Sequence, residues 1–181
     1  MSTLKLGGYA FLAFLALGAF QAVTGVFDEG TEPEAPRLIA RAQPNAKGEW
    51  TRPTMGKIGT AYKRPGPAWA SGYHTGIDFV APSGTPVLAA GPGRIISAGW
   101  GGKYGNQIVI YHEGGTYTQY AHLSRIDIKD GSEVRGGQQI GLTGETGNAF
   151  GPHLHFEARS GPGYGSDIDP SAWMRSHGIN I

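Results

Sequence analysis

The sequence of 181 residues contains no cysteine, which excludes thiol catalysis, disulfide bonds and cysteine-ligated metals. Charged residues are also scarce, at 16% of the chain. The 15 Lys and Arg and the 14 Asp and Glu leave a formal net charge of +1, so no excess of basic residues indicates a nucleic-acid partner. Histidine occurs only six times, so a pattern that places several histidines close together is not expected from composition alone.

Glycine and proline are abundant instead, at 31 and 12 residues, which favours a turn-rich β fold over a helical bundle. One short helix is expected near the C-terminus, with Asp169 as its N-cap, Pro170 as its first residue and Gly178 just beyond its end. Runs of β-type residues at a spacing of about ten favour hairpins in a mostly antiparallel sheet. The predicted strands are 86–90, 93–100, 106–112, 116–123, 138–144 and 153–159.

The N-terminal segment 1–27 is apolar, with Lys5 near its start and no further charge until Asp28. This pattern is typical of an export signal peptide, or of an apolar helix that anchors a protein in the membrane with its C-terminal side outside. A buried core helix is the alternative. Residues 28–47 are rich in proline and charge, which predicts a linker and leaves 48–181 as the compact domain. We therefore expect the domain to act outside the cytoplasmic membrane, either secreted or anchored.

The stretch "GPHLHFE" places His153 and His155 two positions apart in a predicted strand, with Glu157 next in line. Alternate residues of a strand point to the same face, so all three share one face, while Leu154 and Phe156 point toward a core. Glu157 can be an acceptor that orients a ligand histidine, or a structural strand residue; the sequence leaves both interpretations open.

A second histidine pattern lies upstream, where "HTGID" places His74 four residues before Asp78. Catalytic zinc takes three protein ligands from histidines and carboxylates and keeps one position open for water. His74, Asp78 and one histidine of "HLH" would complete such a set, and the other would remain for proton transfer. Either pattern alone is weak, because each arises by chance or for structural reasons; together they favour a metal site.

The other histidines are placed differently along the chain. His122 is expected at the end of a strand in "QYAHLS", where it could join the same site. His112 is expected at a strand end and His177 in the last turn of the terminal helix, and we interpret both as structural.

Four motifs, in order, resemble the lysostaphin/LytM-type zinc metalloendopeptidases, a family of peptidoglycan hydrolases. They are "HTGIDF", "APSGTPVLAAGPGRI", "YGNQIVIYHEGGTYTQYAHLS" and "GSEVRGGQQIGLTGETGNAFGPHLHFE". The resemblance implies that Zn²⁺ is bound by His74, Asp78 and His155, and that His122 and His153 are the catalytic pair. It also implies a LytM-like antiparallel sheet, a duplicated hybrid motif, with a substrate groove whose floor carries the zinc.

The expected activity is hydrolysis of the peptide stems or cross-bridges of peptidoglycan by a zinc-dependent endopeptidase. Two alternatives stay open: a non-catalytic peptidoglycan-binding or amidase-activating module on the same fold, and a zinc D-alanyl carboxypeptidase. Turns such as "WGGKYGN" and "GETGNAFG" are expected to line the groove and would favour glycine or alanine beside the scissile bond.

Overall fold

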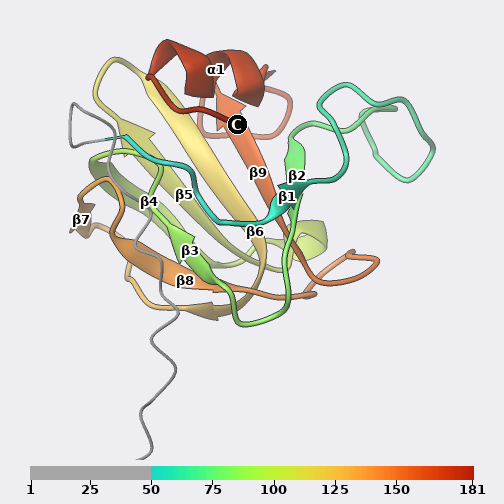
Figure 1. The fold of residues 1–181 in the computed structure, drawn as a ribbon, viewed down its shortest axis with the longest axis horizontal. Coiled ribbons are helices and arrows are strands. Elements are labelled where there is room, and N and C mark those ends of the chain that lie inside the picture. Colours follow the sequence, from blue (N-terminus) through green and yellow to red (C-terminus); the bar gives the residue numbers. More distant parts are fainter. Residues whose placement is uncertain (1–49) are drawn as a thin grey trace, which may run out of the picture. The chain divides into compact units, whose positions relative to one another are not determined.

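The computed structural model of the protein describes residues 50–181, which form a mainly antiparallel β fold with one short C-terminal helix, as the sequence predicts (Figure 1). The elements are β1 (Lys57–Ile58), β2 (Ile77–Val80), β3 (Pro86–Leu88), β4 (Gly93–Trp100), the 3₁₀ helix η1 (Gly102–Tyr104), β5 (Asn106–His112), β6 (Thr116–Ile126), β7 (Glu133–Val134), β8 (Gln139–Thr143), β9 (His153–Arg159), β10 (Asp167–Ile168) and α1 (Pro170–Ser176).

The predicted signal or anchor segment 1–27, with its apolar helix, and the predicted linker 28–47 lie outside the described residues. These two assignments and the domain boundary at residue 48 therefore stay predictions. Within residues 50–181, no helix is long and apolar enough to cross a membrane.

Seven strands run side by side in the order β1-β2-β9-β6-β5-β4-β7. β10 pairs with β9, and β8 pairs with both β6 and β3, in each case antiparallel. The strand that carries the two neighbouring histidines, β9, is therefore central, with β2 on one side and β6 on the other. This order brings the segments that hold the predicted site residues next to one another in space (Figure 1).

Along one of its edges, strand β6 changes its pairing partner at His122, in the middle of the strand. Up to Ala121, which faces His155, β6 pairs with β9; from Leu123, which faces Thr143, it pairs with β8. His122 itself has a φ of 61°, a left-handed conformation that is uncommon for a residue with a Cβ atom. The expectation that a strand ends at this histidine is thus wrong, because β6 continues beyond a local irregularity to Ile126.

The core lies between the strands and α1. Ile108, Ile110 and Phe156 are fully buried in it, and the ring of Tyr120 packs at 5.4 Å from that of Phe156. The helix begins as predicted: Asp169 Oδ1 accepts hydrogen bonds from the first free backbone N–H groups of α1, which stabilises the helix start. The helix contributes Trp173 and Met174 to the core.

A second group of rings lies where α1 meets the start of the described chain. The ring of Trp50 is 4.0 Å from that of His177 and 5.2 Å from that of His112, and Trp173 packs against all three. His112 Nδ1 donates to Pro92 O at 2.7 Å. We call Trp50, His112, Trp173 and His177 the aromatic cluster. Its two histidines have packing roles, in agreement with their structural interpretation.

Candidate metal centre

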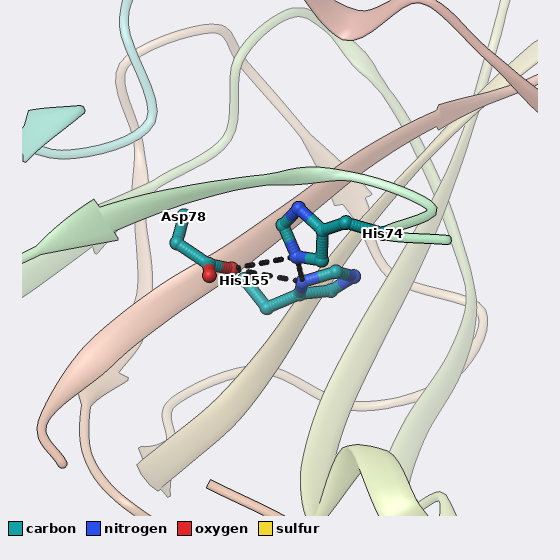
Figure 2. Close-up of side chains that lie close together, drawn as sticks. All are labelled: His74, Asp78 and His155. Atoms are coloured by element: carbon teal, nitrogen blue, oxygen red, sulfur yellow. Dashed lines mark hydrogen bonds and ion pairs between the residues drawn. The ribbon is translucent and has the colours of Figure 1, made fainter. Parts of the chain in front are cut away.

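Three side chains converge on one point: Asp78 from β2, His155 from the adjacent β9, and His74 from the segment just before β2 (Figure 2). His74 Nε2 lies 2.9 Å from His155 Nδ1 and 3.0 Å from Asp78 Oδ1, and His155 Nδ1 is also 3.0 Å from Asp78 Oδ1. The pairing of β2 with β9 sets this arrangement, because Asp78 faces His155 directly in the register. The three atoms form a nearly equilateral triangle, close to the separation of about 3.3 Å expected for ligands of tetrahedral zinc.

In each of the two histidine rings, one nitrogen (the inner one) faces Asp78 and the other (the outer one) faces away. The hydrogen-bond partner of the outer nitrogen shows which of the two carries the hydrogen. His74 Nδ1 is 3.1 Å from Ala61 O, and His155 Nε2 is 2.9 Å from Glu157 Oε1. Both partners can only accept, so these outer nitrogens donate. The inner nitrogens then present lone pairs toward the Asp78 carboxylate. Three acceptors within 3.0 Å of one another repel unless a cation or protons lie among them, so this donor set fits a divalent metal ion such as Zn²⁺.

The pKa values of the groups in this triangle also indicate a site that favours positive charge. Burial alone would raise the pKa of Asp78, but hydrogen bonds with His155 and His74 outweigh it and hold the pKa far below its ordinary value. Burial would also lower the pKa of His155, yet its bonds to Asp78 and Glu157 raise that pKa to about 9. The site therefore attracts positive charge strongly, and a proton competes with a metal ion for His155 Nδ1.

Glu157 lies behind His155 and is almost fully buried. Its Oε1 also accepts from the hydroxyl groups of Thr75 and Tyr104, and its Oε2 accepts from Arg159 Nε at 2.6 Å. Burial opposes ionisation, but these partners, His155 first, lower the pKa of Glu157 to about 2. Of the two interpretations left open by the sequence, the structure favours the acceptor that orients a ligand histidine, an arrangement typical of metal sites.

Gly76, between the two predicted ligands of "HTGID", lies directly against β9. A Cβ atom there would be 2.4 Å from Phe156 O and 2.8 Å from His155 Cε1. Any larger residue would push β2 away from β9 and separate the ligands, so the close approach of the two strands requires glycine at this position.

His122 and His153 lie beside the triangle. Their ring centroids are 4.7 Å apart, and His153 Nε2 is 3.7 Å from Asp78 Oδ1. Each places Nδ1 at 2.8 Å from a backbone carbonyl oxygen, that of Thr146 for His122 and that of Gly151 for His153. In each ring Nδ1 therefore donates, which leaves Nε2 as the basic atom. Burial and the neighbouring His155 lower the pKa of His122 to about 4, so its ring is neutral near pH 7.

All five predicted site residues line one groove of about 1030 Å³. The Gly-rich turns expected to line it do so, through Gly101, Lys103 and Tyr104 of the first turn and Asn148 and Phe150 of the second. A further wall, which sequence reasoning missed, comes from the loop 59–71. Its Trp69 ring packs 5.1 Å from that of His74.

The roles of Arg159, Tyr104 and Trp69 were also missed from sequence. Arg159 stands two positions after Glu157 in the same strand, and this alternation is the only signal that could have linked it to the site. Tyr104, at the end of η1, and Trp69, in the loop 59–71, reach the site only through tertiary folding, which no local periodicity of the sequence indicates.

Comparison with known proteins places these residues in a wider context. Residues 72–170 match the family described as Peptidase family M23. The DD-carboxypeptidase/endopeptidase Mpg of Neisseria meningitidis is 54% identical over 86 residues, which are 48% of this chain and 20% of that protein. The peptidoglycan DD-endopeptidase ShyA of Vibrio cholerae is 49% identical over 85 residues, 46% of this chain and 20% of that protein. The matched regions thus span about a fifth of these relatives.

Solved structures show the same fold. The catalytic domain of the antimicrobial peptidase lysostaphin from Staphylococcus simulans aligns with a TM-score of 0.64 at 36% identity, over 66% of this chain and 92% of that one. A zinc-containing peptidase from Vibrio cholerae aligns with a TM-score of 0.55 at 37% identity, over 61% of this chain and 36% of that one.

Proposed function

Since the chain belongs to peptidase family M23, we propose that it is a zinc-dependent endopeptidase that hydrolyses the peptide stems or cross-bridges of bacterial peptidoglycan. The observation that carries the proposal is the triangle of two histidine nitrogens and one carboxylate oxygen on the floor of a groove, with two further histidines beside it. The names of ShyA and of the zinc-containing peptidase support the substrate and the metal.

His74, Asp78 and His155 would hold the zinc ion, through Nε2, Oδ1 and Nδ1. Bound zinc supplies a Lewis acid that polarises a carbonyl group and lowers the pKa of water toward neutrality. Glu157 keeps the His155 ring in the tautomer that binds, and the Ala61 carbonyl does the same for His74. Both ligands are thus oriented before any substrate arrives.

His122 and His153 are the groups available to move protons. Each has a basic Nε2, because its Nδ1–H is committed to a backbone carbonyl. One of them would accept the proton of the attacking water at Nε2 and pass that same proton to the leaving amine as the peptide bond breaks. With their ring centroids 4.7 Å apart, both histidines lie on the same side of the triangle and could reach one substrate carbonyl bound at it.

The groove favours a peptide over a glycan strand. Among the described residues that line it, Asp78 carries the only carboxylate, whereas glycan hydrolysis usually requires two carboxylates that flank the bond. The walls offer the aromatic rings of Trp69, Phe150 and Tyr164 and the cations of Arg64 and Lys103. These cations suit a peptide that bears carboxylates beside the scissile bond, in addition to the small residues that the Gly-rich turns would admit.

A second candidate is removal of a terminal D-alanine, a carboxypeptidase activity. The name of Mpg, which joins both activities, favours it, and Arg64 or Lys103 could bind the terminal carboxylate. The remaining alternative, a non-catalytic binding or amidase-activating module, is disfavoured because all five site residues are present and face one groove.

A digest of purified sacculi by the zinc-loaded protein tests the proposal. We expect new free amino groups without new reducing sugar ends, and mass spectrometry of the products identifies the bond that is cut. Release of free alanine alone would support the second candidate, and reducing ends alone would refute the peptidase. Binding to sacculi without any product would favour the non-catalytic module.

Action on peptidoglycan also requires that residues 28–181 reach the outside of the cytoplasmic membrane. A reporter fused after residue 30 should be active only when exported. Activity confined to the cytoplasm would contradict this part of the proposal.

A further inference from the structure

A buried carboxylate outside the metal triangle, that of Asp167 in β10, gathers three side chains of the loop 59–74. Tyr62 Oη donates to its Oδ2 at 2.8 Å, and Tyr73 Oη donates to its Oδ1 at 3.4 Å. Lys63 Nζ forms an ion pair with Oδ2 at 3.4 Å, and the Asp167 side chain is only 2% exposed. Asp167 thus fastens the base of this loop to the sheet, because β10 pairs with β9.

The same part of the loop forms a backbone frame for two metal ligands. Lys63 N–H donates to His74 O at 2.9 Å, and His74 N–H donates to Arg64 O at 2.9 Å. Asp78 N–H donates to Thr60 O at 3.0 Å. The segment 60–64 therefore runs alongside the segment that carries both ligands and pairs with it like an additional strand.

This frame also sets the His74 ring, since the acceptor for His74 Nδ1–H is the carbonyl oxygen of Ala61. Next to it, Lys63 has a φ of 60°, a conformation that a residue with a Cβ atom keeps only when its surroundings hold it. The surroundings here are the ion pair with Asp167 and the ring of Tyr73, whose centroid is 3.3 Å from Lys63 Nζ.

The phenol of Tyr62 remains a donor over the whole working range of pH. Burial and the neighbouring Asp167 raise the pKa of Tyr62 to about 12. Its hydrogen bond to the carboxylate therefore persists at neutral pH.

We propose that Asp167 is a positioning residue for the metal centre, which fixes the segment 60–64 and through it the backbone and the ring of His74. The side chain of Asp167 forms its hydrogen bonds and ion pair with Tyr62, Lys63 and Tyr73. Among the described residues, it forms none with the three proposed ligands or the two proposed catalytic histidines. The inference rests on the proposed function in one respect only, namely that His74 is a zinc ligand. It gives β10, a strand of two residues, a role in the site.

The test compares Asp167→Ala with Asp169→Ala as a matched control. Asp169 lies two positions later and caps α1, so its replacement weakens the fold without contact to the loop. Amide hydrogen exchange of the metal-free proteins, followed by NMR, should be at least about tenfold faster at Lys63 and His74 in Asp167→Ala only, because these amides bond across the frame. Amides of β5 should be unchanged.

A second readout is zinc affinity, measured by chelator competition. We expect a loss of about tenfold or more in Asp167→Ala, the range typical when a group that orients a ligand is removed, and a smaller loss in Tyr62→Phe, which keeps the ring and removes only the hydroxyl. Equal exchange and equal affinity in Asp167→Ala and Asp169→Ala would overturn the inference. If the unsubstituted protein binds no zinc, the proposed function fails, and the exchange experiment still decides whether Asp167 holds the frame.

Discussion

The six histidines fall into two groups whose neighbours differ in kind. Four of them line the groove. In each of these four rings, one nitrogen donates to a carbonyl or carboxylate oxygen behind the ring, and the other side of the ring is turned to the site. The other two belong to the aromatic cluster and pack against indoles. In this second group His112 has partners on both ring nitrogens, Pro92 O at 2.7 Å and Thr118 Oγ1 at 2.8 Å.

The difference shows that the second nitrogen decides what a histidine can do. The two nitrogens of His112 are bonded to uncharged protein groups, and within the described part of the chain no carboxylate that could share a metal ion is among their partners. A ring with one nitrogen bound and the other directed at charged or basic atoms is pre-oriented for chemistry. Substitutions in the two groups should therefore have different effects, on metal binding and turnover in the first group and on stability in the second.

Replacement of His155 by Ala should abolish stoichiometric zinc binding and peptidoglycan hydrolysis, because it removes one of three ligands and leaves the Asp78 charge with fewer partners. His112→Ala should keep one zinc per chain and lose stability by about 1–3 kcal/mol, from its buried hydrogen bonds. Metal analysis after dialysis, together with thermal melting, checks both. A His155→Ala protein that still retained stoichiometric zinc would sink the ligand assignment.

Replacement of His122 or His153 by Ala should leave zinc bound but lower turnover by about 10²–10⁴-fold, the usual contribution of general acid–base groups. Steady-state turnover at a matched zinc content measures this effect. Should either variant lose the metal instead, the assignment of ligand and proton carrier within this group would have to be exchanged.

In the aromatic cluster, we expect protonation of His112 to make the stability of the fold depend on pH. Burial lowers the pKa of His112 to about 4 from an ordinary value of 6.5. The unfolded chain then binds more protons than the folded one between these two values, so stability is full above about pH 6.5 and is lost as the pH falls toward 4. The loss is on the order of 3 kcal/mol. Denaturant titrations of the unsubstituted protein and of His112→Phe should differ by this slope; parallel profiles would contradict it.

Glu157→Ala should weaken zinc binding by about 10–100-fold, because the His155 ring loses the acceptor that orients it. Glu157→Gln keeps an oxygen for His155 Nε2 but loses the charge beside Arg159, so its affinity should lie between those of Glu157→Ala and the unsubstituted protein. Isothermal titration of zinc into the three metal-free proteins measures their zinc affinities and ranks them. Equal affinities in all of them would show that the buried carboxylate serves the fold alone.

Sequence patterns located most of the sheet. The strands β4, β5 and β9 begin and end where the runs of β-type residues and their flanking turns place them. The strands β1, β7 and β10 have only two residues each, which is too short for any alternation to be visible. These three depend on tertiary pairing.

For the site, the two histidine patterns were sufficient to name residues that the structure brings to one groove. The sequence left open which histidine of "HLH" joins His74 and Asp78; the register of β2 against β9 places His155, rather than His153, opposite Asp78. The contacts of Asp167 with the loop cross more than 90 positions of chain, and no local pattern indicates them.

The left-handed backbone at His122 has a consequence for protein engineering. Asparagine, like histidine, is among the residues that tolerate this conformation, so His122→Asn should keep the backbone of β6, and the variant should fold. The same change removes one of the two proposed proton carriers. A library screened for folding alone would therefore retain inactive proteins at this position, and a useful screen has to score hydrolysis of peptidoglycan in the same round.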